Sequence, residues 1–137
     1  MIQGFIREAN TARVQTLLKS LFDKEPAVIH VPEFCLLECT NVLWKQMRFH
    51  GVSQATTQKA LNSLMVTPVT IQPVIDLLPR ALIIGNEHNL AIYDSIYIAM
   101  SEKLEHSLIT VDIRQASVAA TVGITLKSLS DFPKFEP

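Results

Sequence analysis

Three of the thirteen acidic residues lie in apolar surroundings, where an ionised carboxylate is costly unless a cation or a polar partner stabilises it. Glu38 interrupts a run of Cys and Leu residues, Asp94 lies inside the apolar stretch 90–97, and Asp112 closes the apolar run 108–111. Carboxylate oxygens are the ligands that Mg²⁺ and Mn²⁺ prefer. These acids therefore predict a site for a hard divalent cation.

Each acid also has a purely structural explanation. Asp94 and Asp112 both stand near the start of a helical pattern, so either carboxylate could cap a helix. Glu38 lies inside the predicted helix 33–50, where no cap is needed, and could instead pair with Lys45. The sequence alone leaves both explanations open.

A polar stripe follows Glu38 along the same predicted helix. Asn41, Lys45 and Arg48 stand three, seven and ten residues after Glu38, a spacing that places all four side chains on one helical face. The amide lies toward the acid, and the two bases could position a nucleic-acid backbone along the helix. For each base taken alone, an ordinary solvated face is the simpler explanation.

Helical and strand-like segments alternate along the chain, which predicts an α/β fold with a mainly parallel sheet. Gly51 is placed to end one helix, while Ser53 and Asp76 are placed to cap two others. In such sheets, ligand sites form at the carboxyl ends of the strands, where Asp112 lies. The expected helices cover 11–22, 33–50, 53–65, 76–88, 93–104 and 114–120, and the expected strands cover 27–31, 69–72, 107–111 and 124–127.

The chain has 137 residues, 48% of them hydrophobic and 18% charged, which predicts a single packed domain. A formal net charge of -1 excludes a strongly basic nucleic-acid binder, so any contact with nucleic acid needs a local patch or a metal. The two cysteines, Cys35 and Cys39, suit a reducing cytoplasm, and we expect core packing rather than a soft-metal site with His30. No apolar run is long enough to span a bilayer.

Three segments of the chain resemble the internal acidic motifs of PIN domains, and most closely those of the VapC-type ribonuclease toxins of toxin–antitoxin pairs. The resemblance implies a PIN-like three-layer fold, with a mainly parallel sheet flanked by helices and an acidic pocket at the strand ends. Glu38, Asp94 and Asp112 would then be the catalytic acids that hold Mg²⁺ or Mn²⁺ for cleavage of RNA. The family also implies a homodimer and an antitoxin protein as partner. The segments that carry the resemblance are Val31–Leu43, Tyr93–Ala99 and Leu108–Asp112.

The N-terminus departs from the PIN pattern. Members of the family begin with an apolar strand that ends in Asp, and residues 1–10 resemble the stretch that follows this Asp. We therefore expect a single PIN-like domain over 1–137, N-terminally shortened. Its first strand either belongs to a start further upstream, or is missing, or is replaced by Met1–Ile6 or by a partner chain. The expected function is an Mg/Mn-dependent endoribonuclease impaired by the lost acid. The alternative is a catalytically inactive PIN-like module that binds RNA or a partner protein.

Overall fold

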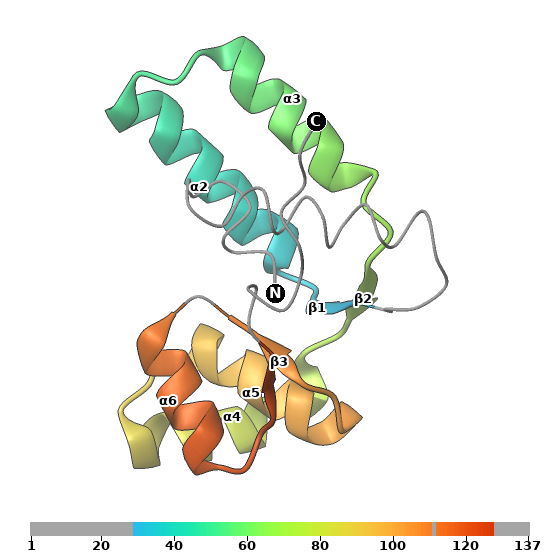
Figure 1. The fold of residues 1–137 in the computed structure, drawn as a ribbon, viewed down its shortest axis with the longest axis vertical. Helices are drawn as coiled ribbons and strands as arrows, with labels where there is room; N and C mark the ends of the chain where they lie inside the picture. Colours follow the sequence, from blue (N-terminus) through green and yellow to red (C-terminus); the bar gives the residue numbers. More distant parts are fainter. Residues whose placement is uncertain (1–28, 111, 128–137) are drawn as a thin grey trace.

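The computed structural model describes residues 29–110 and 112–127 (Figure 1). The predicted helix 11–22 and the proposed replacement of the missing first strand by Met1–Ile6 lie outside these residues. No helix in the described ranges is both long and apolar enough to cross a membrane.

The elements follow in this order: β1 (His30–Pro32), α2 (Cys35–His50), α3 (Gln54–Met65), β2 (Thr70–Gln72), the 3-10 helix η1 (Ile75–Leu77), α4 (Leu78–His88), α5 (Ile92–Leu104), β3 (Leu108–Ile109), α6 (Ile113–Thr121) and β4 (Leu126–Lys127).

The strands form two parallel pairs. β1 pairs with β2, with His30 opposite Thr70, and β3 pairs with β4, with Leu108 opposite Leu126. An α/β fold with parallel strands is therefore confirmed. One continuous sheet was expected, however, and the described residues form two separate two-stranded sheets. The pairs stay separate because no strand of the described ranges joins β1 to β3.

The helices α2 and α3 form an antiparallel hairpin whose ends follow the local signals in the sequence (Figure 1). Gly51 ends α2 in the left-handed conformation, with φ 68°, which glycine adopts without steric cost. Ser53 caps α3 by accepting a hydrogen bond from the Thr56 backbone N–H at 3.1 Å. Both predictions are confirmed.

Two of the helix caps that the sequence suggested do not form. Asp76 does not cap a helix but lies within η1, and α4 begins at Leu78 without a side-chain cap. The tighter 3-10 turn forms first, with the Leu77 N–H bound to a backbone carbonyl three residues earlier. The helix α5 begins at Ile92 after the N-cap residue Ala91, so Asp94 lies in its first turn and makes no capping hydrogen bond.

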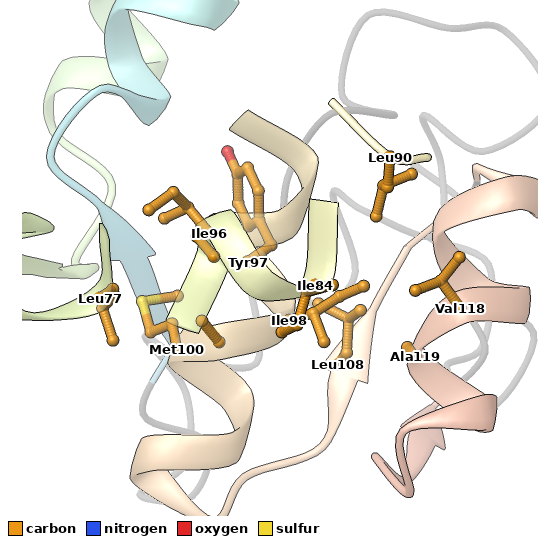
Figure 2. Close-up of a cluster of buried hydrophobic side chains, with 12 residues drawn as sticks. Leu77, Ile84, Leu90, Ile96, Tyr97, Ile98, Met100, Leu108, Val118 and Ala119 are labelled. Carbon is orange, nitrogen blue, oxygen red and sulfur yellow. The ribbon is translucent and has the colours of Figure 1, made fainter. Parts of the chain in front are cut away.

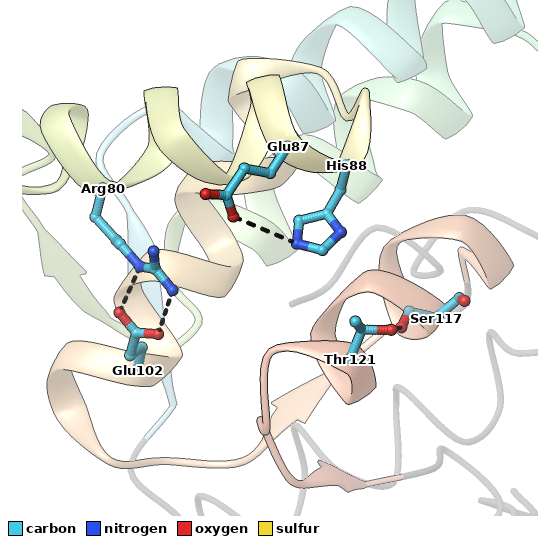
Figure 3. Close-up of polar contacts among 6 residues, drawn as sticks. All are labelled: Arg80, Glu87, His88, Glu102, Ser117 and Thr121. Carbon is cyan, nitrogen blue, oxygen red and sulfur yellow. Dashed lines mark hydrogen bonds and ion pairs between the residues drawn. The ribbon is translucent and has the colours of Figure 1, made fainter.

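Two clusters of buried side chains divide the molecule into an α2–α3 half and an α4–α6 half. The first cluster joins β1 to the α2–α3 hairpin and includes Val31, Cys35 and Leu43. The second, larger cluster lies between α4, α5, α6 and β3, as Figure 2 shows. On the surface of this half, Arg80 of α4 and Glu102 of α5 form an ion pair with a nitrogen–oxygen distance of 2.8 Å (Figure 3).

Candidate acidic site

The N-terminal end of α5 links two of the predicted acids. Asp94 lies in the first turn of this helix, and Tyr97 follows one turn later. The buried Tyr97 donates its hydroxyl hydrogen to Glu38 Oε1, with an oxygen–oxygen distance of 2.7 Å. This hydrogen bond joins the first turn of α2 to the first turns of α5, across the boundary between the two halves.

The fully buried Gln115 links Asp94 to the third acid, Asp112. Its backbone N–H donates to Asp112 Oδ1 at 2.8 Å, and its side-chain amide donates to the backbone carbonyl of Asp94 at 3.0 Å. The remaining amide oxygen accepts a hydrogen bond of 2.6 Å from the Thr110 hydroxyl. Asp112 is therefore the N-cap of α6, which is the structural role that the sequence left open for it. This cap uses one of the two carboxylate oxygens of Asp112.

The three carboxylates influence one another electrostatically. Burial raises the pKa of Glu38, the Tyr97 hydrogen bond partly opposes this rise, and the negative charge of Asp94 adds to it. Burial also raises the pKa of Asp94, and the charge of Asp112 contributes to the increase. Like charges in a half-buried place favour either a proton or a cation. The arrangement therefore provides negative charge that is only partly compensated by the protein.

The donor chemistry of this site fits a hard divalent cation, since all three side chains offer carboxylate oxygens. The geometry is less complete. Within the described part of the chain, no three or more His, Cys, Asp or Glu side chains are grouped so that they could hold one ion. Glu38, Asp94 and Asp112 are connected through Tyr97 and Gln115 rather than gathered around one point.

The predicted stripe on α2 is exposed. Asn41, Lys45 and Arg48 belong to one continuous helix, and all three lie on its solvent side. Their role in positioning RNA stays a prediction. The ion pair proposed as the structural explanation of Glu38 is not found among the described residues, where Lys45 forms no salt bridge and Glu38 is bound by Tyr97.

The two cysteines pack in the core, as predicted, with Cys35 only 1% exposed. A hydrogen bond from Cys39 lowers the pKa of the Cys35 thiol to about 7. The alternative of a soft-metal site with His30 is not found in the described ranges. His30 instead accepts or donates a hydrogen bond of 2.9 Å with the Gln72 amide and stacks on His106.

Sequence reasoning missed three residues that position the acids. Gln115 stands three residues after Asp112, and this Asp-x-x-Gln spacing is a capping-box pattern that could have identified it. Tyr97 lies 59 positions from Glu38 in the sequence, so its contact with that acid has no local signal. Phe34, just before α2, packs edge-on against Tyr97 with ring centres 5.8 Å apart.

The fold and site thus define an α/β protein with linked carboxylates near the carboxyl ends of parallel strands. No family model matches the sequence. VapC ribonuclease Mb0985 of Mycobacterium bovis and ribonuclease VapC9 of Mycobacterium tuberculosis are each 31% identical to it over 86 residues, which cover 63% of this chain and 66% of the relative. Ribonuclease VapC3 of Pyrobaculum aerophilum is 24% identical over 86 residues, 61% of this chain and 66% of the relative. The match spans just under two thirds of the length of these relatives, and the chain is similar to VapC ribonucleases over that part.

Proposed function

We propose that the chain is a VapC-type toxin ribonuclease of PIN-like fold that cleaves RNA with the help of Mg²⁺ or Mn²⁺. The observation that carries this proposal is the linkage of Glu38, Asp94 and Asp112, which come from distant segments and act on one another through their charges. The similarity to relatives named as ribonucleases supports the same reaction. An antitoxin protein as partner and a homodimer belong to this proposal.

The acids and their neighbours have distinct tasks in the proposed mechanism. Glu38, Asp94 and Asp112 would hold the cation, which when bound would supply charge stabilisation at the phosphate and a more acidic water. Gln115 fixes the backbone beside two of these acids, so their carboxylates need little reorganisation. The Tyr97 hydroxyl favours the ionised form of Glu38, because it donates a hydrogen bond to the carboxylate.

The exposed face of α2 would position the substrate. Lys45 and Arg48 would contact phosphates of the RNA backbone, and Asn41 lies between these bases and Glu38 along the helix. Such contacts orient the backbone and carry little sequence information. Replacement of either base is therefore expected to weaken RNA binding more than it slows cleavage at saturating RNA.

Cleavage of an end-labelled single-stranded RNA in the presence of Mn²⁺ tests the proposal. Asp94→Asn and Asp112→Asn should each reduce the cleavage rate at least about 100-fold, because each removes a charged oxygen ligand. Asp76→Asn is the matched control, since this acid is exposed and lies away from the site. Metal-stimulated cleavage that persists in both site variants would contradict the proposal.

One observation favours a catalytically inactive module as the second candidate. The described acids do not form a complete three-ligand metal site. Calorimetric titration of the wild-type protein with Mn²⁺ separates the two functions. Binding that Asp94→Asn abolishes supports the ribonuclease, whereas RNA binding without Mn²⁺ binding or cleavage supports the inactive module.

A further inference from the structure

Large apolar side chains on the surface accompany all three predicted acids. A single exposed apolar side chain is common in proteins, but each of these adjoins a residue of the proposed cation site. Tyr93 is the one aromatic residue among them, so it can offer a flat ring as well as apolar area. The three neighbours are Leu37 before Glu38, Tyr93 before Asp94 and Ile113 after Asp112, and their exposed fractions are 70%, 62% and 87%.

The ring of Tyr93 packs against Phe34, which lies just before α2. The two ring centres are 5.0 Å apart, and the ring planes are nearly perpendicular, at 89°. This edge-to-face arrangement is a favoured aromatic geometry, and it covers at most one face of the Tyr93 ring. Since Tyr93 remains largely exposed, Phe34 orients the ring and still leaves it accessible to a ligand.

The same aromatic contacts continue to Glu38. Phe34 also packs edge-on against Tyr97, with ring centres 5.8 Å apart, and the Tyr97 hydroxyl donates to the Glu38 carboxylate. Tyr93 and Tyr97 are four residues apart on α5, so their side chains lie on one face of that helix. The exposed Tyr93 ring therefore lies on the side of α5 that faces the start of α2, where Glu38 is bound.

This position places the ring where a nucleotide at the acids would carry its base. Tyr93 is next to Asp94 in the first turn of α5, and the Cα atoms of adjacent residues are about 3.8 Å apart. The base and the phosphate of one nucleotide are joined through a single sugar. A phosphate that lies beside the carboxylates therefore leaves its base within reach of the side chains that border them.

We propose that Tyr93 binds the substrate by stacking its ring on the nucleobase next to the phosphate that is cleaved. This inference rests on the proposed function, since it concerns RNA bound at the acidic site. An aromatic ring can stack on any base, because every base has a π-face, so the contact positions the strand without selecting a sequence. A base inside a duplex is already stacked on its neighbours, and the ring therefore requires an unpaired base.

A second pair of exposed aromatic rings lies further along α2 and provides a comparison. Trp44 and Phe49 also meet edge to face, with ring centres 5.8 Å apart, and they are 49% and 65% exposed. They follow Glu38 by six and eleven residues, which is about 9 and 16 Å along the helix axis. The two aromatic sites therefore differ in their distance from the acids, and an experiment can tell them apart.

Photocrosslinking tests the inference with a readout that does not depend on cleavage. The probe is a short single-stranded oligouridylate that carries 5-iodouridine, irradiated with the full wild-type chain in the presence of Mn²⁺. Mass spectrometry of the digested protein should place the main crosslink at Tyr93, because iodouracil reacts with an aromatic ring that it contacts. A main crosslink at Trp44 or Phe49, or no crosslink, overturns the proposal.

The same experiment separates this inference from the proposed function. Cleavage of RNA together with a main crosslink at another residue would leave the ribonuclease proposal intact and contradict the role of Tyr93. A main crosslink at Tyr93 without any cleavage would support the role of the ring and count against the ribonuclease.

Three variants distinguish stacking from simple packing. Tyr93→Leu keeps apolar contact with Phe34 but has no π-face, so it should weaken binding of the unmodified oligouridylate about tenfold in fluorescence anisotropy. Tyr93→Phe keeps the ring and should bind within about twofold of the wild type. Leu82→Ala, an exposed apolar change on α4, is the control and should leave binding unchanged. Wild-type affinity in Tyr93→Leu, or equally weak binding by Tyr93→Phe, would show that the ring does not stack on a base.

Discussion

The two halves of the molecule hold their polar side chains in different ways. In the α2–α3 half, most side-chain hydrogen bonds reach only three or four residues along the chain, as between Ser53 and Thr56. In the α4–α6 half several of them also connect separate elements: Arg80 binds Glu102, and Arg114 binds the carbonyl of Asn89. The buried Gln115 belongs to the same set.

This difference decides how firmly each acid is positioned. Asp94 and Asp112 lie in the α4–α6 half and share Gln115, which connects the cap of α6 to the first turn of α5. Glu38 comes from the other half and is bound across the boundary by the Tyr97 hydroxyl. Two acids therefore share one positioning residue within a single half, whereas the third is held by a hydrogen bond from the other half.

Replacement of the shared partner should have the largest effect on stability. Gln115→Leu leaves the Asp94 carbonyl and the Thr110 hydroxyl without the amide that binds them, at a cost of about 2–4 kcal/mol in the free energy of unfolding. Urea denaturation of the purified variant measures this loss. Gln58→Leu, an exposed change on α3, is the control and should alter stability by less than about 0.5 kcal/mol. Equal effects of the two changes would contradict the assigned role of Gln115.

The close approach of α4 to the start of α5 gives the next largest effect. A Cβ atom at Gly85 would lie 2.8 Å from the backbone carbonyl of Leu90 and 3.0 Å from Ile92 Cδ1. Gly85→Ala should therefore lower the free energy of unfolding by about 1–3 kcal/mol, because backbone cannot yield as a side chain can. Thermal unfolding provides the measurement. Asn86→Ala, exposed on the same helix, should be neutral or slightly stabilising, and a stabilising Gly85→Ala would disprove the close packing.

Helix ends were predictable wherever a local signal decides them. Gly51 and Ser53 act within a few residues of the backbone groups that they affect, so their roles follow from sequence. The start of α5 was placed one residue late, and Asp94 was offered as its cap, because Ala91 carries no capping side chain to mark the true N-cap. The same limit applies to Asp76, which lies within a 3-10 turn that was not expected.

The candidate site was predictable in its residue types but not in its connections. Apolar surroundings made Glu38 and Asp94 conspicuous, since burial of a carboxylate needs an explanation. The hydrogen bond between Tyr97 and Glu38 joins residues 59 positions apart, and no periodicity encodes such a contact. Sheet order is equally non-local, which is why two separate strand pairs were not foreseen.

Asp112 and Ser53 are both N-caps, and a comparison of the two tests the capping role of Asp112 separately from its negative charge. Asp112→Ala and Ser53→Ala should each lower the free energy of unfolding by about 1 kcal/mol, because each removes an N-cap acceptor. Asp112→Ser keeps a capping oxygen and should restore most of this stability, although it lacks the carboxylate. Under the proposed function, Asp112→Ser is stable but does not cleave RNA, whereas Ser53→Ala cleaves normally. Recovery of cleavage in Asp112→Ser would mean that the residue is only a cap.

The hydrogen bond from Tyr97 to Glu38, which crosses the boundary, should give the smallest change in stability and the clearest change in the titration of Glu38. Tyr97→Phe should cost less than about 1 kcal/mol at neutral pH, because the half-buried Glu38 can bind water instead. The same change should raise the pKa of Glu38 further, since the phenol hydrogen bond opposes the effect of burial. A carboxyl whose pKa is raised by folding destabilises the folded protein above that pKa, and this penalty disappears as the pH falls below the ordinary value of 4.5. The variant should therefore gain more stability than the wild type on acidification toward pH 4.5, and NMR titration of Glu38 should place its midpoint at higher pH. An unchanged midpoint would show that the hydroxyl does not hold Glu38.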